Sequence, residues 1–417
     1  MYQRPQYETL KRRLNEPVRF INIIAGPRQV GKTTIVRSLI KGHTEKSLYI
    51  SVDDSGDLPL TDTQATVAPP SKRDSEWLKY YWGYARACAV KWLSNQQNYE
   101  KKPFVFALDE IQKISNWSEV IKGLWDSDRA NGLDMHVILL GSAPLLMQKG
   151  LSESLAGRYE VISVSHWGFT EMQMAFDFSL EEYIYFGGYP GSAGFIRDEP
   201  RWRSYLINSL IKPNIEKDIL DIVRIKHPHL LKELFELGCH YSGRELSLTK
   251  MIASLNDAKH TETLADYLEL LNQVKLLAGL NKYAAQEVRK RNSVPKLNIY
   301  NTGLMSAIND YTFAEAQADR SYWGRLVESS VGAHLLNTCS EETNICYWRD
   351  GSDEVDFVVS QGRKLAAIEV KSSSNPVKSK GLDEFCKKYT SANKILVGKE
   401  GVSIAEFLSY PTDHWLN

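Results

Sequence analysis

Two carboxylates and a lysine interrupt strand-like apolar sequence near the end of the chain. Residues 354–373, EVDFVVSQGRKLAAIEVKSS, place Asp356 in one apolar run and Glu369 and Lys371 in the next. The Gln-Gly pair between the runs predicts a hairpin turn. Strand alternation puts Glu369 and Lys371 on one face, and the hairpin would bring Asp356 near them. Such a set could hold Mg²⁺ and hydrolyse phosphodiesters, or it could be a charged face exposed to solvent.

A third carboxylate comes earlier, in a segment with helical periodicity. Apolar residues recur at every fourth position from Trp323 to Leu335, which predicts one apolar helix face. Glu328 lies beside this stripe, so we expect it near the boundary between helix and sheet. The candidate nuclease set is therefore Glu328, Asp356, Glu369 and Lys371, with Asp356 and Glu369 as the Mg²⁺ ligands.

A second kind of chemistry is indicated near the N-terminus, where residues 20–34 read FINIIAGPRQVGKTT. A buried strand, a glycine-containing loop and a helical pattern follow one another, which is the context that a phosphate-binding loop requires. Backbone amides and the helix N-terminus would surround phosphate oxygens. Lys32 would reach the β and γ phosphates, and the Thr33 hydroxyl would bind Mg²⁺. The predicted ATP-binding residues are Gly26, Pro27, Arg28, Gln29, Val30, Gly31, Lys32, Thr33 and Thr34.

Two further strands end in polar residues that could complete this site. PFVFALDEIQ, residues 103–112, ends its apolar run at Asp109 and Glu110. Asp109 would contribute to the Mg²⁺ shell, and Glu110 would polarise the attacking water. MHVILLGSAPLL, residues 135–146, reaches Ser142, which either contacts the γ-phosphate or is an ordinary turn serine.

The order of GPRQVGKTT, FALDE, LLGSA and SLAGR resembles that of the AAA+ ATPase superfamily. This resemblance implies a parallel sheet domain in which Ser142 is a sensor. It also implies that Arg158, which precedes the fifth strand, reaches the γ-phosphate bound by a neighbouring subunit. The working form would then be a homo-oligomer, often a hexameric ring. The alternative for Arg158 is a surface salt bridge.

The middle of the chain suggests a linker and a small DNA-binding module. YFGGYPGSAG, residues 185–194, predicts a turn or hinge, and residues 229–284 read as three helices followed by two short strands. This order favours a winged helix-turn-helix whose third helix enters a major groove. A packing module is the alternative. Basic residues that could neutralise DNA phosphates cluster over 275–296: Lys275, Lys282, Arg289, Lys290, Arg291 and Lys296.

The C-terminal charged set resembles the PD-(D/E)xK, or restriction-endonuclease-like, superfamily, although Glu354-Val355 stands where the proline of that formula would precede Asp356. With the GGYP element at 187–190, nearly the whole chain resembles prokaryotic AAA+ ATPases that carry a nuclease-like C-terminal domain. The segment near 55–100 matches least. The resemblance carries architecture and ATP chemistry to this chain more directly than a biological role.

Composition sets limits on these expectations. Lys plus Arg and Asp plus Glu are both 51, so the net charge is +0 and any DNA contact must come from a local patch. The five cysteines form no CxxC pair, which favours free thiols in the cytoplasm. We find no apolar signal-peptide core and no transmembrane run, so we expect no membrane partner.

The predicted fold class is α/β, in four parts. Residues 1–175 form the AAA+ domain with an insertion at about 55–100, and 176–228 form a helical lid or linker. Residues 229–284 form the winged helix, and 285–417 form the nuclease-like domain. The predicted function is an ATPase that uses ATP and Mg²⁺, acts on DNA and could cut it. The alternatives are a nucleotide-controlled scaffold and a junction-remodelling ring whose nuclease fold does not cut.

Overall fold

The computed structural model forms two compact units, Gln3–Val164 and Ser165–Asn417. The residues that it describes are 2–41, 46–53, 70–96, 102–142, 147, 150–151, 154–215, 225, 227–255, 260–284, 293–372 and 379–416. The division at 164 comes earlier than the predicted domain end at 175, because residues from 165 onward pack with the second unit. Among the described helices, none has the length and apolar character that crossing a membrane requires.

The first unit is built on a five-stranded sheet. Its strands are β1 (Ile21–Ala25), β2 (Ser47–Ser51), β3 (Phe104–Asp109), β4 (Met135–Gly141) and β5 (Tyr159–Ser163). Their order is β2-β3-β4-β1-β5, and all neighbours are parallel. The carboxyl ends of β1, β3 and β4 therefore meet at one edge, where ligands bind in sheets of this kind.

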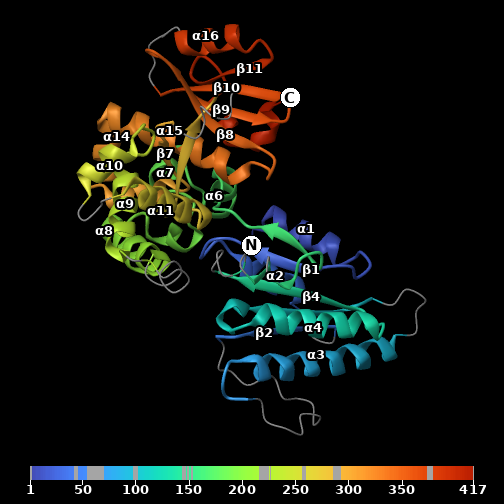
Figure 1. Ribbon diagram of the computed structural model, residues 1–417. Helices are drawn as coiled ribbons and strands as arrows, with labels where there is room; N and C mark the ends of the chain where they lie inside the picture. The colour runs from blue at the N-terminus through green and yellow to red at the C-terminus, as the bar shows by residue number, and fades with distance from the viewer. Residues whose placement is uncertain are drawn as a thin grey trace. The chain divides into compact units, whose positions relative to one another are not determined.

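Helices cover both faces of this sheet, which explains its continuously apolar strands. α1 (Pro5–Arg13) and α2 (Lys32–Ile40) pack on one face, and α3 (Ser75–Asn95) and α4 (Trp117–Ala130) pack on the other (Figure 1). Strand alternation separates the two cores. Ile24 joins the cluster of α1 and α2, whereas its neighbour Ile23 joins the cluster of α3 and α4.

α3 corrects the interpretation of residues 55–100 as an insertion. Because β2 and β3 are parallel neighbours, the chain must cross over between them, and α3 is the helix of that crossover. Its aromatic residues Trp77 and Trp82 are buried in the core. Residues 54–69 and 97–101 of this segment lie outside the described residues.

The second unit begins with helices. α6 (Phe169–Phe176), α7 (Leu180–Phe186), the short helix η2 (Pro190–Phe195), α8 (Glu199–Tyr205) and the π-helical turn η3 (Leu206–Ile211) follow one another. The GGYP element follows α7 and runs into η2, where we expected a turn or hinge. It is instead a packed junction, because the Gly188 amide donates to Asn301 Oδ1 at 3.2 Å and Tyr189 is buried.

Three helices and a β-hairpin come next. The helices are α9 (Pro228–His240), α10 (Leu248–Ser254) and α11 (Thr261–Gln273), and the antiparallel strands are β6 (Leu277–Lys282) and β7 (Lys296–Ile299). A single bridge pairs Glu245, between α9 and α10, with Lys296. The predicted boundary at 284 is wrong, since it separates β6 from the strand with which it pairs.

The hairpin continues into the C-terminal sheet. β8 (Asn344–Asp350), β9 (Asp353–Gln361), β10 (Lys364–Lys371) and β11 (Ala392–Gly398) complete a six-stranded mixed sheet in the order β11-β10-β9-β8-β6-β7. The accompanying helices are α13 (Thr302–Ile308), α14 (Phe313–Ala318), α15 (Arg320–Thr338), α16 (Lys380–Lys388), α17 (Ile404–Phe407) and η5 (Thr412–Leu416). α15 packs on β7 and β10, and α16 packs on β9 and β10.

Candidate functional site

The predicted phosphate-binding loop joins β1 to α2. Residues 26–31 form the loop, Lys32 is the first residue of α2, and Thr33 and Thr34 follow in its first turn. Gly31 has a φ of 93°, which residues other than glycine rarely adopt. At Gly26 a Cβ would lie 1.9 Å from the Val164 carbonyl oxygen, so the close approach of the two backbones requires glycine.

Lys32 lies inside this loop. Its buried ammonium donates to the carbonyl oxygens of Gly26 at 2.9 Å and Pro27 at 2.7 Å. A second cation holds the loop from outside, because Arg4 Nη1 donates to the Val30 carbonyl oxygen at 3.0 Å. Sequence reasoning missed Arg4, since it stands 26 positions away in a segment without a motif. The loop is thus preorganised around a positive charge that can meet phosphate oxygens.

Asp109 connects three elements at the edge of the sheet. Its Oδ2 accepts hydrogen bonds from Thr33 Oγ1 at 2.8 Å and from the Tyr49 hydroxyl, and its Oδ1 accepts from the Glu110 amide at 2.9 Å. Burial and the carboxylate of Asp109 raise the pKa of Tyr49 well above its usual range, so the phenol stays a donor. Tyr49, on β2, is a site residue that the sequence analysis missed.

Glu110 is held close to the same edge. Its Oε2 accepts from Ser142 Oγ at 2.9 Å and from Gln112 Nε2 at 2.6 Å. Glu110 has a left-handed φ of 57°, which turns the chain sharply at the end of β3. The structure therefore brings together Lys32, Thr33, Asp109, Glu110 and Ser142, which the sequence had placed in three separate segments.

These residues fit Mg²⁺ and a triphosphate. The hydroxyl of Thr33 and the carboxylate of Asp109 are hard oxygen donors 2.8 Å apart, the donor type that Mg²⁺ prefers. The loop ends at the N-terminus of α2, where backbone amides favour anions. Thr33 and Asp109 are therefore the residues that could hold Mg²⁺ beside the phosphates.

Arg158 lies away from this edge of its own sheet. It precedes β5, whose first residue pairs with the first residue of β1, whereas the phosphate-binding loop follows the last residue of β1. Its Nε and Nη2 donate to the two carboxylate oxygens of Asp126 at 2.8 and 2.9 Å. Hydrogen bonding from Arg158 lowers the pKa of Asp126. Arg158 therefore contributes nothing to the ATP site of its own chain.

Two of the C-terminal carboxylates lie on β9 and β10, paired interior strands of the second sheet, and the third, Glu328, lies on α15. The β9–β10 register pairs Phe357 with Ile368, which brings Asp356 beside Glu369, and Asp356 Oδ2 accepts from the Val370 amide at 2.8 Å. Lys371 Nζ donates to Glu369 Oε1 at 2.5 Å. Burial and the charge of Asp356 raise the pKa values of Glu328 and Glu369 above the usual range.

A residue from the supposed basic patch completes this cluster. Lys296 Nζ lies 2.5 Å from Glu328 Oε1 and 3.5 Å from Asp356 Oδ1, and it is buried. Burial alone would lower the pKa of Lys296, but Glu328 and Asp356 outweigh burial and raise it, so the ammonium stays charged. The assignment of Lys296 to an exposed DNA-binding surface is wrong. Within the described part of the chain, no group of three or more acidic, His or Cys side chains is arranged to hold a metal ion.

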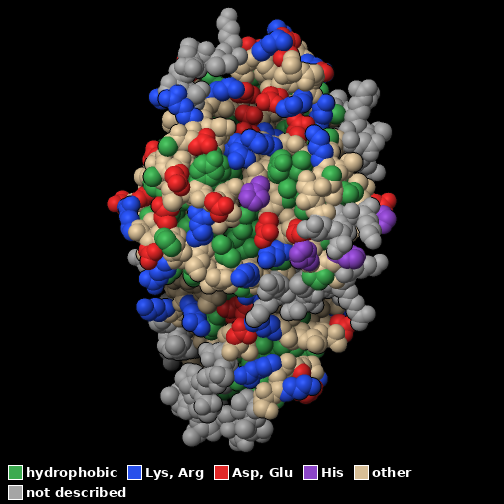
Figure 2. Space-filling model, turned by 90° about the vertical axis from the view of Figure 1, so that its left-hand side faces the viewer, with side chains coloured by type: hydrophobic (Ala, Val, Ile, Leu, Met, Phe, Trp, Pro, Cys, Tyr) green, Lys and Arg blue, Asp and Glu red, His purple; other side chains and the backbone are tan. Residues whose placement is uncertain are grey.

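The exposed face of α11 is acidic. Glu262, Asp266 and Glu269 are exposed and recur at intervals of four and three, so they lie on one side of the helix. This face would repel DNA phosphates, against the expectation that α11 enters a major groove. Arg289, Lys290 and Arg291 of the predicted basic segment lie outside the described residues. Figure 2 shows basic and acidic side chains interspersed on the face that it displays.

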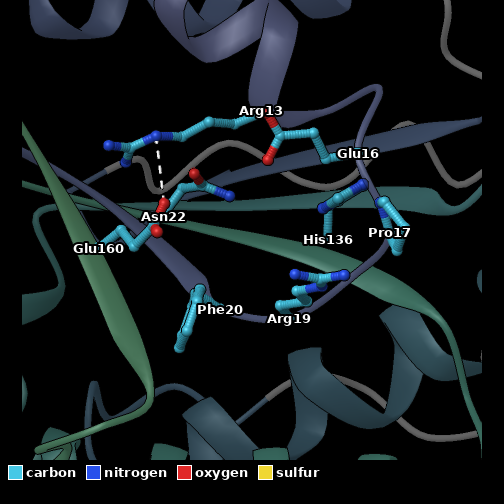
Figure 3. A pocket seen from close by; sticks show the side chains of 8 residues that line it. All are labelled: Arg13, Glu16, Pro17, Arg19, Phe20, Asn22, His136 and Glu160. Atoms are coloured by element: carbon cyan, nitrogen blue, oxygen red, sulfur yellow. Dashed lines mark ion pairs between the residues drawn. The ribbon is translucent and has the colours of Figure 1, made fainter.

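The structure contains one cavity beside the C-terminal cluster and another in the first unit. One, of about 350 Å³, opens beside Lys296, Glu328 and Asp356 and has the exposed Arg244 at its wall. The other, of about 100 Å³, lies in the first unit and is lined by Asn22, His136 and the ion pair of Arg13 with Glu160 (Figure 3). No sequence motif indicated the second cavity, because its residues come from three separate segments.

Comparison with known proteins supports the ATPase assignment. Residues 18–173 match a family model described as an AAA domain. Residues 177–315 and 323–408 match two domains of unknown function, DUF8612 and DUF4143. Residues 18–173 are therefore an AAA-type ATPase domain, and the chain is an ATPase.

Relatives with about a quarter of their residues identical to this chain match most of its length. An uncharacterized protein of Mycobacterium tuberculosis is 25% identical over 86% of this chain and 72% of its own length. An uncharacterized protein of Methanocaldococcus jannaschii is 22% identical over 81% of this chain and 72% of its own length. Among solved structures, a Walker-type ATPase of Pyrococcus abyssi has a TM-score of 0.44 and 13% identity, covering 74% of this chain and 96% of that one.

Proposed function

We propose that this ATPase is a nucleotide-controlled switch that hydrolyses ATP with Mg²⁺ and acts on DNA through the Ser165–Asn417 unit. The observation that carries the ATP-hydrolysing part of the proposal is the convergence of Lys32, Thr33, Asp109 and Glu110 at one edge of the first sheet. This arrangement supplies a phosphate cation, Mg²⁺ ligands and a carboxylate for water activation.

Each residue has a defined part in hydrolysis. Lys32 exchanges its two carbonyl partners for β- and γ-phosphate oxygens, and backbone amides of the loop bind the remaining oxygens. Bound Mg²⁺ supplies positive charge that offsets the charge developing on the phosphates. Glu110 leaves Gln112 and Ser142 to orient the attacking water, and Ser142 is then free to contact the γ-phosphate.

The DNA part of the proposal is supported by the order of elements from α9 to β7. A helix, a bridging residue, two helices and a hairpin follow one another as in winged helix-turn-helix modules. Because the exposed face of α11 is acidic, we place the phosphate contacts at the preceding helix, α10, and at the turn before it, since that helix crosses the DNA backbone in such modules. Lys250 is exposed on α10, and Arg244 is exposed between α9 and α10.

We interpret the sheet from β8 to β11, together with α15, as restriction-endonuclease-like. The support is the gathering of Glu328, Asp356, Glu369 and Lys371 around the β9–β10 hairpin. In this interpretation the sheet helps the unit to grip DNA.

A second candidate is a nucleotide-controlled scaffold that binds a basic protein. The observation in its favour is the acidic face formed by Glu262, Asp266 and Glu269 on α11. Slow ATP turnover with retained nucleotide would accompany this function.

Phosphate release measured with linear, branched and single-stranded DNA tests the proposal. We expect DNA to stimulate the wild-type ATPase. The double substitution Arg244→Glu and Lys250→Glu should remove the stimulation and keep the basal rate, whereas Lys387→Glu, on the exposed surface of α16, should change neither. An ATPase that ignores every DNA tested would contradict the proposal and favour the scaffold.

Charge reversal on α11 separates the two candidates. Replacing Glu262, Asp266 and Glu269 by lysine removes the face that a basic protein would bind. For the DNA-acting switch, the same change should tighten DNA binding, because a repulsive charge near the phosphates disappears.

A further inference from the structure

Lys296 is placed as an internal counter-ion among the C-terminal carboxylates. Its Nζ lies 2.5 Å from Glu328 Oε1 and 3.5 Å from Asp356 Oδ1, and it donates to the Asp356 carbonyl oxygen at 3.2 Å. The ring of Phe357 has its centre 4.9 Å from the same ammonium. The lysine is thus surrounded by oxygen atoms and an aromatic face, as a bound cation would be.

The ammonium of Lys296 stands between Glu328 and Asp356, where a divalent ion shared by these two carboxylates would lie. Mg²⁺ binds oxygen ligands at about 2.0–2.1 Å, so an ion that bridged Glu328 and Asp356 would overlap Lys296 Nζ. The third carboxylate, Glu369, forms an ion pair with Lys371, whose Nζ lies 2.5 Å from Glu369 Oε1. Each of the three carboxylates therefore has an ammonium group within ion-pair distance.

The backbone keeps Lys296 in place. It begins β7, pairs with Leu280 of β6 and forms the bridge to Glu245, so its Cα cannot withdraw without breaking the hairpin. Removing one partner of a buried ion pair leaves the other charge uncompensated, which is strongly unfavourable. A metal ion could enter only by displacing a charge that is both buried and anchored.

We infer that Lys296 replaces a divalent cation in this cluster, and that the C-terminal sheet therefore works without metal and does not cut phosphodiesters. Glu328, Asp356 and Glu369 become a divalent-cation site only when the charge of Lys296 is removed. This inference is independent of whether DNA is the partner, because it concerns the carboxylates alone.

Mn²⁺ binding to the full-length protein tests the inference. Calorimetric titration without nucleotide measures the Mn²⁺ bound by wild type and by Asp356→Asn. Mn²⁺ sites elsewhere in the protein contribute equally to both measurements. Wild type and Asp356→Asn should therefore bind the same amount of Mn²⁺. Lys296→Met should bind one Mn²⁺ ion more than wild type, because a like charge beside the carboxylates is removed. The double variant Lys296→Met with Asp356→Asn should not bind this further Mn²⁺ ion.

Thermal unfolding provides a second measurement. Mn²⁺ should raise the unfolding temperature of Lys296→Met and leave the difference between wild type and Asp356→Asn unchanged. Lys282→Met, on the neighbouring strand β6, is the matched control and should gain no Mn²⁺ site.

Two results would overturn the inference. One is wild-type protein that binds a Mn²⁺ ion which Asp356→Asn lacks, or that cuts DNA in Mn²⁺ faster than Asp356→Asn. The other is a folded Lys296→Met that gains no Mn²⁺. If Lys296→Met does not fold, the comparison of wild type with Asp356→Asn decides alone.

Discussion

A substitution of Glu110 should lower the rate of ATP hydrolysis without preventing ATP binding. We expect Glu110→Gln to lower phosphate release by about 10²–10⁴-fold, since a positioned base contributes this much, while ATP still binds. Gln keeps the hydrogen-bonding shape but cannot polarise water as a carboxylate does. Phosphate release and binding of a fluorescent ATP analogue measure the two effects.

Lys32→Ala is the companion variant and should lose both binding and hydrolysis, because the ammonium inside the loop is removed. Near-normal turnover by Glu110→Gln would show that another group activates the water.

Tyr49 should affect the affinity for Mg²⁺ through its hydrogen bond to Asp109. Tyr49→Phe removes one of the two hydrogen bonds that Asp109 Oδ2 accepts. Partners of metal ligands contribute about 10–100-fold to metal affinity, so we expect the Mg²⁺ requirement to rise within this range. Titrating Mg²⁺ against both ATPase rate and nucleotide affinity measures the shift.

Tyr410→Phe, at an exposed tyrosine of the other unit, should leave the Mg²⁺ requirement unchanged. An unchanged requirement in Tyr49→Phe as well would mean that the phenol only packs against the sheet.

At the scale of single residues, the sequence predicted side-chain types better than their partners. Lys32, Thr33 and Asp109 could be assigned because each stands at a fixed place in a local motif. The contact of Tyr49 with Asp109 joins positions 60 apart and depends on the pairing of β2 with β3. A motif within one segment contains no information about that pairing.

Among the elements, α15 contains a histidine that should make the fold sensitive to acid. His334 is buried, and its Nε2 lies 2.7 Å from the Tyr410 carbonyl oxygen, so Nε2 is the protonated nitrogen. Nδ1 is buried without a hydrogen-bond partner. Burial therefore lowers the pKa of His334 to about 4.

The direction of the pH effect follows from the two pKa values. The unfolded pKa of histidine is about 6.5, so between the two values the unfolded chain binds more protons than the folded one. Wild-type stability should fall as pH drops from about 6.5 to about 4, by up to about 3 kcal/mol from this residue. His334→Gln should flatten that part of the profile in denaturant unfolding measured across this range.

His229→Gln, on an exposed position of α9, serves as the control and should follow the wild-type profile. Parallel profiles for wild type and His334→Gln would refute the assigned role of His334.

The hairpin of β9 and β10 is an element that the sequence predicted and the structure confirms, although its turn is Gly362-Arg363, one residue later than the predicted Gln361-Gly362. The six-stranded sheet is an element that it did not predict. The pairing of β6 with β8 joins segments more than 60 positions apart, and nothing within either strand specifies its neighbour.

For the whole molecule, Arg158 is the residue that should show whether active sites are shared between chains. Its ion pair with Asp126 is partly exposed, with side-chain exposures of 32% and 46%, and such pairs contribute only about 0–1 kcal/mol. Release of Arg158 toward a neighbouring chain therefore costs little.

A mixing experiment tests sharing of sites. Arg158→Ala alone should lose ATPase activity, and so should Lys32→Ala alone. Mixed together, they should regain part of the wild-type rate, because intact Arg158 from one chain would meet an intact loop from the other. Wild-type activity in Arg158→Ala, at any protein concentration, would show that Arg158 only forms a salt bridge.

The sequence by itself determined the ATPase chemistry and the residue types of the C-terminal cluster. Phosphate-binding loops and hairpin turns depend on backbone conformations and hydrogen bonds among near neighbours in the chain, so a short segment specifies them. The GKT segment and the DE pair could be assigned for this reason.

Only the tertiary structure decided which charges meet. Lys296 belonged to a basic stretch by sequence, yet the pairing of β7 turns it toward Glu328 and Asp356. The exposed side of α11 proved acidic because packing buried its apolar side and left Glu262, Asp266 and Glu269 outside. Electrostatic interactions depend on distance and burial, and both are set by contacts between segments that are remote in the chain.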